Sequence, residues 1–292
     1  MNGPPEKGTE IPSLVSGLSS NLDNTLERIT RIRTCADRLG IPVRSGSRVD
    51  LLERQLKKFA HVKQDDLQRR GFDWVSFTEG MRDVHEVDFI CRALSGKKTV
   101  EMKQLLHDAL AGAVLPHQDR NPSARNIQFQ LYIAALFEFS GLPVGLAEPD
   151  IIFECTSSKY GIAAKRILSR TQLDRRLKEG KSQLDKAGLK GIIAVCFDRL
   201  LPQKAARAIY SSEEGIEKSA KRTLQKILVR ERRKILSILD EPSVLGIIAS
   251  LAVPGVYKAA NLRFSLSSAV IPSWAAKPEA ATLAKSVHLR IG

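Results

Sequence analysis

Apolar residues recur at every third or fourth position from about residue 20 to residue 115, and this spacing predicts helices. One apolar stripe runs from Leu22 to Ile32, and the pattern Ser47-x-x-Asp50 marks the start of a second helix. No strand-like alternation and no internal repeat interrupt this part of the chain. We therefore expect it to be helical.

The hydrophobic pattern changes after residue 124. The run GIIAVCFD is almost wholly apolar, which is typical of a strand covered on both faces. The predicted elements are a helix at 125–141, two strands within 142–155, a strand within 160–168, a helix at 169–188, a strand at 191–198, a helix at about 213–240 and strands at 244–253 and 262–271. This order predicts an α/β fold with a mixed sheet flanked by helices.

The change of pattern divides the chain into four segments. A polar linker, HQDRNPSA, separates the helical part from the α/β part. We expect a disordered tail at 1–20, a helical N-terminal domain at 21–116, an α/β domain at 124–272 and a C-terminal tail at 273–292.

The charge balance narrows the class of partner. The 292 residues include 46 Lys and Arg against 32 Asp and Glu, which gives a net charge of +14. Such an excess favours polyanionic partners, with nucleic acid first and an anionic membrane second. No apolar run approaches the roughly 18 residues that span a bilayer. We therefore expect DNA as the partner, with RNA as an alternative, and no membrane.

The cysteines and the N-terminus indicate a cytoplasmic protein. The four cysteines form no C-x-x-C pair, which argues against a zinc site and fits a reducing compartment. The N-terminus lacks the basic and apolar regions of a secretory signal. Phosphate-binding loops and the nucleophile motif of α/β-hydrolases are also absent from the sequence, so an ATPase or such a hydrolase is not expected.

Two predicted strands carry an acid and a base at positions suited to metal-assisted hydrolysis of a phosphodiester. Asp150 opens one strand, and Lys165 lies on the next, beyond a turn at 156–159. Mg²⁺ needs carboxylate oxygens, and a lysine can orient the attacking water and offset charge. Because side chains alternate along a strand, Ala163 shares a face with Lys165. Position 163 is therefore where a second carboxylate would complete the site.

These residues resemble the PD-(D/E)XK nuclease superfamily, which has the restriction-endonuclease-like fold. Pro149-Asp150 matches the PD element, and Ala163-Ala164-Lys165 occupies the (D/E)-x-K element, 13 residues further along. The predicted order αβββαβ matches the core of the family. The resemblance covers residues 124 to about 250 and implies an endodeoxyribonuclease that depends on Mg²⁺ or Mn²⁺.

The resemblance also implies roles for individual residues. Asp150, residue 163 and the carbonyl of Ala164 would hold the metal, and Lys165 would position the attacking water. Gln130 stands where the family often has a helical glutamate. The expected nucleic-acid contacts, which lie beside the site, are Arg166, Arg170, Arg175, Arg176, Lys178 and Gln183.

Ala163 departs from the family pattern and leaves three explanations open. The alanine is an introduced substitution that removes catalysis, or the carboxylate has migrated, or the domain is a natural pseudo-nuclease that only binds. Glu154 shares a strand face with Asp150 but lies four residues further along, roughly 13 Å away. Glu148 and Glu138 are no worse candidates for a migrated carboxylate.

Two functions are consistent with this pattern. The first is a Mg²⁺-dependent DNA endonuclease, whose helical N-terminal domain selects the substrate or a partner. The alternative is a catalytically inactive nuclease-fold protein that binds nucleic acid or assembles a larger complex. A homodimer is attractive because cutting both strands needs two sites, and a partner subunit would serve the same purpose. Residues 217–234, with eight basic and two acidic residues, form a second surface suited to phosphate contacts.

Overall fold

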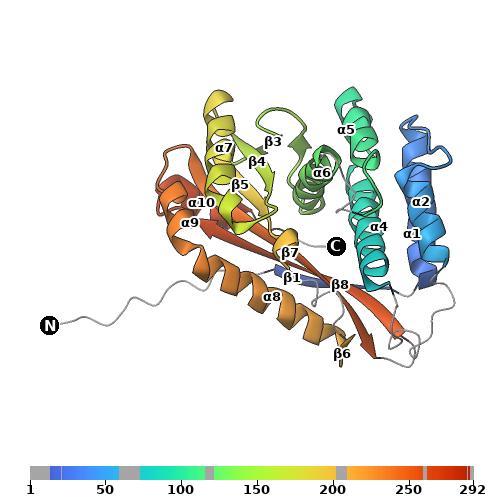
Figure 1. Ribbon diagram of the computed structural model, residues 1–292. Helices are drawn as coiled ribbons and strands as arrows, with labels where there is room; N and C mark the ends of the chain where they lie inside the picture. The colour runs from blue at the N-terminus through green and yellow to red at the C-terminus, as the bar shows by residue number, and fades with distance from the viewer. Residues whose placement is uncertain are drawn as a thin grey trace.

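The computed structural model describes residues 14–20, 22–58, 73–115, 122–201, 209–258, 262–287 and 289. These residues form one mixed sheet with helices on both faces, as Figure 1 shows. The α/β fold predicted from the sequence is therefore confirmed. The eight strands of the described residues run in the order β1-β8-β7-β5-β4-β3-β2, and β6 pairs with β7.

The strands lie close to the predicted apolar runs. Their bounds are β1 Leu14–Ser20, β2 Val144–Gly145, β3 Ile151–Cys155, β4 Ser158–Arg166, β5 Gly191–Cys196, β6 Ile209–Tyr210, β7 Val244–Lys258 and β8 Leu262–Trp274. β4 pairs in antiparallel fashion with β3 and in parallel fashion with β5. All six residues of β5 are buried, as its apolar sequence predicts. This buried strand supports β4, the strand that carries Lys165.

The helices form layers on the two faces of the sheet. Their bounds are α1 Leu22–Arg38, α2 Arg48–Lys57, α4 Trp74–Leu94, α5 Val100–Leu110, α6 Ser123–Phe139, α7 Leu173–Lys186, α8 Glu213–Arg230, α9 Arg232–Leu239 and α10 Pro278–Ser286. α6 and α4 cover one face, and α7, α8 and α9 cover the other (Figure 1). α1 and α2 pack on α4, while α5 packs on α6. None of the helices that the structure describes is both long and apolar enough to cross a membrane.

The N-terminal part is helical in the described residues, as the apolar spacing predicts. Ser47 caps α2, because its side chain accepts a hydrogen bond from the backbone N–H of Asp50 at 3.5 Å. The buried apolar residues of these helices belong to the same hydrophobic cluster as those of the sheet. The predicted division into two domains stays a prediction. Residues 1–13 of the expected tail and 117–121 of the expected linker lie outside the described residues.

Three segments differ from the sequence prediction. Residues 14–20 of the expected tail form β1, because the open edge of β8 offers them an antiparallel partner. The expected C-terminal tail contains α10. The helix expected at 213–240 is two helices, α8 and α9, because Glu231 leaves helical geometry at φ −94° and ψ 9°. Its side chain accepts a hydrogen bond from Lys234 Nζ at 2.6 Å.

The hairpin of β3 and β4 is held by a tight turn and by two glycines. Thr156 and Ser157 both have positive φ, at 48° and 63°, as a two-residue hairpin turn requires. A Cβ on Gly161 would lie 2.7 Å from Pro149 Cγ. A Cβ on Gly191 would lie only 1.8 Å from the carbonyl oxygen of Gly161. The missing side chains therefore let β4 approach both β5 and the segment that carries Asp150.

Candidate functional site

A cleft of about 220 Å³ lies beside the end of β4, between the first turns of α6 and α7. It contains most of the residues that the sequence singled out as a nuclease-like site. The lining residues are Ser123, Asn126, Ile127, Gln130, Asp150, Ala164, Lys165, Arg166 and Arg176. Residues 40 or more positions apart in the sequence thus meet at one place in the fold.

Asp150 and Lys165 are brought together as predicted. The Asp150 Oδ2 atom accepts a hydrogen bond from Lys165 Nζ at 3.2 Å and another from the backbone N–H of Ala164 at 2.8 Å. Lys165 Nζ also donates to the carbonyl oxygen of Ala164 at 3.1 Å. The side chains are only 21% and 11% exposed for Asp150 and Lys165 respectively. This ion pair is therefore shielded from bulk water, although it borders the cleft.

Burial raises the pKa of Asp150 above its ordinary value. The positive charge of Lys165 and the hydrogen bond from Ala164 act in the opposite direction, while the negative charge of Glu148 raises the pKa further. Desolvation of the carboxylate thus outweighs its favourable contacts. A divalent cation would reverse this balance, because it would favour the ionised carboxylate.

Two glutamines hold the segment that carries Asp150. Gln130 on α6 donates from Nε2 to the carbonyl oxygen of Asp150 at 2.8 Å. Gln183 on α7 donates from Nε2 to the carbonyl oxygen of Pro149 at 2.9 Å. Both glutamines bind the main chain and not the Asp150 carboxylate. They are therefore placed to position Asp150, from opposite faces of the sheet.

Ala163 is fully buried and does not line the cleft. Strand alternation places it on the face covered by α7, because Gly161, two residues earlier, faces Leu184 of that helix. Lys165 lies on the same side of β4 by the same rule. The neighbourhood of Ala163 is thus closed by side chains, and a larger residue there must displace its neighbours or extend toward Lys165.

The three glutamates considered for a migrated carboxylate lie in different places. Glu138 accepts a hydrogen bond from the backbone N–H of Val144 at 3.0 Å and pairs with Lys97, also at 3.0 Å. Glu154 is 70% exposed on the hairpin and lies 3.6 Å from Lys159. Glu148 is exposed, and its negative charge raises the pKa of Asp150. It is therefore the one of the three glutamates whose charge affects the site.

The basic residues predicted to contact nucleic acid divide into two groups. Arg166 and Arg176 line the cleft. Arg166 and Arg170 have no ion-pair partner among the residues that the structure describes. Three of the predicted contacts are on α7 and form ion pairs with carboxylates of the same helix: Arg175 with Glu179 at 3.7 Å, Arg176 with Glu179 at 2.7 Å and Lys178 with Asp174 at 2.8 Å. Their positive charge is therefore partly compensated.

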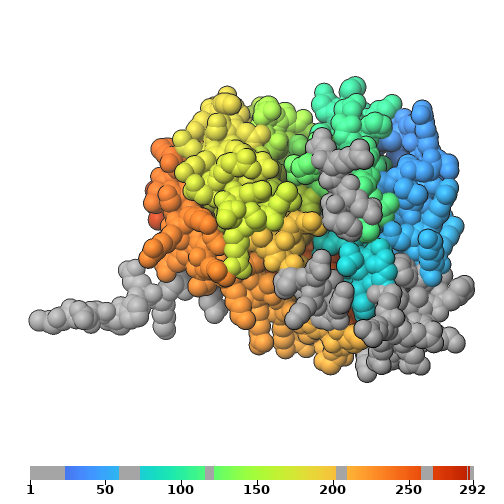
Figure 2. Space-filling view, viewed as in Figure 1, coloured from blue at the N-terminus to red at the C-terminus, as the bar shows by residue number. Residues whose placement is uncertain are grey.

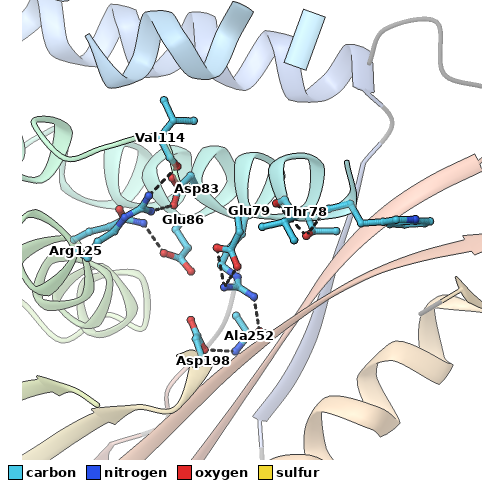
Figure 3. Close-up of polar contacts among 12 residues, drawn as sticks. Thr78, Glu79, Asp83, Glu86, Val114, Arg125, Asp198 and Ala252 are labelled. Atoms are coloured by element: carbon cyan, nitrogen blue, oxygen red, sulfur yellow. Dashed lines mark hydrogen bonds and ion pairs between the residues drawn. The ribbon is translucent and has the colours of Figure 1, made fainter. Parts of the chain in front are cut away.

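A second polar cavity, which the sequence did not predict, lies between α4, the end of β5 and the middle of β7 (Figure 3). Arg82 on α4 bonds to Glu79 at 3.1 and 3.2 Å, and its Nη2 atom donates to the carbonyl oxygen of Ala252 at 3.4 Å. Asp198 accepts a hydrogen bond from the backbone N–H of Ala252 at 2.7 Å. The sequence did hold a signal, because Glu79, Arg82 and Glu86 recur at helical spacing on one side of this helix.

Glu86 is a carboxylic acid of this cavity whose pKa is raised. Burial and the nearby negative charge of Asp198 raise the pKa of Glu86 to about 7, although Arg82 and Arg166 act to lower it. Gln128 on α6 donates to Glu86 Oε2 at 2.6 Å. Asp83, Tyr132 and Cys196 also border the cavity. Because Arg166 lines this cavity as well as the cleft, the charge of Glu86 acts next to the candidate site.

Replacement of Glu86 by glutamine is expected to remove part of the pH dependence of stability. The pKa of Glu86 is higher in the folded protein, so its stabilising effect is complete below pH ~4.5 and is lost as pH rises to about 7. The loss of unfolding free energy between pH 5 and pH 8 should therefore be smaller in Glu86→Gln, by roughly 1–3 kcal/mol. Urea unfolding at both pH values measures it. The exposed Glu101 provides the control, since Glu101→Gln should leave the pH dependence unchanged; an equal change in both variants would contradict the assignment.

The described residues do not contain a ready metal centre. No group of three or more His, Cys, Asp or Glu side chains among them is arranged to hold an ion. The four cysteines are free and buried, and two of them, Cys35 and Cys91, form a side-chain hydrogen bond with each other. Any ion in the cleft would therefore depend on Asp150, main-chain carbonyls, water and substrate.

Comparison of the chain with family models, with curated proteins and with solved structures finds no match. The case for a function therefore depends on the cleft itself.

Proposed function

We propose that the cleft is a nuclease-like site for a phosphodiester of nucleic acid, and that the protein is a Mg²⁺-dependent DNA endonuclease whose cleavage depends on the residue at position 163. One observation carries this proposal: the Asp150 carboxylate, the Ala164 main chain and the Lys165 ammonium meet within 3.2 Å of one another in one cleft. The order α6-β2-β3-β4-α7-β5 supports it, because it repeats the αβββαβ order of the superfamily that the sequence resembles.

Each residue of the cleft has a role in this proposal. Asp150 and the carbonyl of Ala164 would hold Mg²⁺ or Mn²⁺, and the ion would stabilise negative charge on the phosphate. Lys165 would bind the attacking water or a phosphate oxygen. Arg166 and Arg176, on the cleft wall, would contact neighbouring phosphates. The substrate is DNA in this proposal, and the same contacts would accept RNA.

The donor set of this chain fits a divalent ion poorly as it stands. One carboxylate lines the cleft, and Lys165 Nζ lies within hydrogen-bond distance of both atoms that would ligate the ion. The ammonium thus takes the position of the cation. This observation favours a second candidate function, in which the protein is a non-catalytic nuclease-fold subunit that binds nucleic acid.

Titration with Mn²⁺ by calorimetry separates the two candidates. If the ammonium competes with the ion, the wild-type protein should bind Mn²⁺ only weakly, and Lys165→Met should bind it at least about tenfold more tightly, because a positive charge next to Asp150 is removed. Asp150→Asn should abolish the heat in the Lys165→Met background. The exposed Lys186 on α7 provides a matched control, Lys186→Met, which should behave as the wild type.

The outcomes assign the function as follows. Wild-type affinity for Mn²⁺ equal to that of Lys165→Met would remove the argument for competition and favour the endonuclease. Absence of Mn²⁺ binding in every variant, together with salt-sensitive affinity for DNA, would favour the non-catalytic subunit. Absence of both would contradict both candidates.

A further inference from the structure

A row of basic side chains runs along the outer face of α8 and into α9. We name it the α8 ridge; it consists of Lys218, Arg222, Lys226, Arg230, Arg232 and Arg233, all of them exposed. The first four are spaced four residues apart, so successive members lie about 6 Å apart along the helix axis and form one slanting line. Figure 2 shows α8 and α9 in orange at the surface of the protein. The ridge is thus a continuous feature of one face.

The positive charge of the α8 ridge is not compensated within the described residues. Lys218 pairs with Glu214 at 2.7 Å, but the other five members have no ion-pair partner in the parts of the chain that the structure describes. From Lys218 to Lys234 the sequence has eight basic residues and one acidic residue. That acid, Glu231, is 7% exposed and bonds to Lys234. The basic residues of α7, by contrast, pair with carboxylates of their own helix.

The apolar face of α8 is already covered by the protein. Its buried residues, Ile216, Ala220, Leu224 and Ile227, face the sheet, where α8 packs on β7 and β8. A helix that lies in a membrane surface must bury its apolar face in lipid, and this face is not free to do so. Exposed apolar residues on the two helices are limited to Val229 and Leu236, at 75% and 46% exposure. The ridge therefore offers charge without a surface for insertion.

The composition of the two helices favours contact with phosphates and not with bases. Residues 213–239 contain no aromatic residue, so the ridge lacks the aromatic side chains on which the bases of a single strand usually stack. The line from Lys218 to Arg230 is about 18 Å long, which exceeds the roughly 12 Å width of the DNA major groove. Cations at its two ends can therefore reach phosphates on both sides of one groove.

We propose that the α8 ridge binds the phosphate backbone of double-stranded DNA, at a surface separate from the cleft of Asp150 and Lys165. The ridge lies on the face of the sheet that α7 also covers, and the start of α7 borders the cleft. A duplex held on the ridge would thus be bound on the same side of the sheet as Arg176 of the cleft. The choice of DNA as the polyanion rests on the proposed function, but the binding does not require catalysis.

The test compares two triple variants that remove the same charge. The ridge variant carries Arg222→Gln, Lys226→Gln and Arg230→Gln, and the control carries Arg44→Gln, Lys98→Gln and Lys103→Gln, three exposed positions near α1 and α5. Binding of a fluorescent DNA duplex of about two helical turns is followed by anisotropy across a salt series. The ridge variant should lose at least about tenfold in affinity, and the slope of log K against log salt should fall by about 2–3, while the control changes by less than about twofold.

Three outcomes would overturn the proposal. An equal loss in the two triple variants would show a general effect of net charge, and no loss in the ridge variant would remove the ridge from binding. Ridge-dependent binding to phosphatidylserine vesicles without ridge-dependent binding of duplex would assign the surface to a membrane. Circular dichroism confirms that both variants fold. The ridge variant, titrated with Mn²⁺ as described above, should behave as the wild type because its three substitutions lie outside the cleft, so a failure of the metal site and a failure of the ridge are distinguishable.

Discussion

Replacement of Ala163 by glutamate is expected to produce Mg²⁺-dependent cleavage of DNA at least about 100-fold above the wild-type rate. Ala163 lies on the same side of β4 as Lys165, next to the Asp150 contact. The introduced carboxylate would supply a second hard oxygen ligand and a new partner for the Lys165 ammonium. That partner would draw the ammonium away from the Ala164 carbonyl, which it now occupies at 3.1 Å. Both changes make the cleft a better site for the ion.

Ala163→Gln is the matched control for this experiment. It adds nearly the same volume at a fully buried position but no charge, so a gain caused by altered packing would occur in both variants. Cleavage is measured on supercoiled plasmid with Mg²⁺ and with Mn²⁺. Addition of Lys165→Ala to Ala163→Glu should abolish the activity, because no group then positions the water.

Thermal unfolding provides a second measurement. A buried carboxylate without a cation destabilises the fold, so Ala163→Glu should unfold at a lower temperature than the wild type in EDTA. Mg²⁺ should restore part of this loss, since a ligand that binds only the folded state stabilises it. A folded Ala163→Glu protein that neither responds to Mg²⁺ nor cleaves any DNA substrate would contradict the endonuclease proposal.

Replacement of Gly191 by alanine is expected to destabilise the protein by about 3 kcal/mol or more. The added Cβ would lie 1.8 Å from the Gly161 carbonyl oxygen and 2.7 Å from the Gly161 carbonyl carbon, and these main-chain atoms cannot rotate away. β4 and β5 would have to separate where they pair. Because Gly161 is two residues from Ala163, the cleft should be disturbed together with the fold.

Gly96 provides the control for this substitution. A Cβ at Gly96 would meet no atom within 4 Å, so Gly96→Ala should change stability by no more than about 0.5 kcal/mol. Urea unfolding of the two variants gives the comparison, and the yield of soluble protein gives a second measure. If Gly191→Ala were as stable as Gly96→Ala, the pairing of β4 with β5 described above would be wrong.

The sequence predicted the central strands because their apolar runs are unambiguous. GIIAVC has no polar residue, and a short run of this kind, rich in Ile and Val and bounded by Gly and Asp, is typical of a strand covered on both faces. The pairing of Asp150 with Lys165 was also predictable, because a short turn between two strands forces their facing positions together. The resemblance predicted roles for Gln130 and Gln183, and both bond to the main chain of the segment that carries Asp150, but the atoms that they contact were not predictable.

The ion pairs between side chains of α7 could have been predicted from the sequence but were not. Asp174 with Lys178, and Arg175 with Glu179, stand four residues apart on one helix, a spacing that favours ion pairs. The basic side chains of α7 are therefore less available to phosphates than their number suggests. Among the residues of the α8 ridge, only Lys218 has an acidic residue, Glu214, four residues away. The other cations of the ridge have no acidic residue at this spacing.

The sequence by itself determined the α/β class, the order of the elements from α6 to β5 and the hairpin that joins Asp150 to Lys165, because these follow from local periodicity and short loops. Only the tertiary structure decided the rest. The pairing of β1 with β8, the cavity around Glu86 and Asp198 and the burial of Ala163 depend on contacts between distant segments. The position of the Lys165 ammonium between the Asp150 carboxylate and the Ala164 carbonyl also could not be predicted from the sequence. It is set by side-chain packing and electrostatics within a few ångströms, which no periodicity in the sequence records.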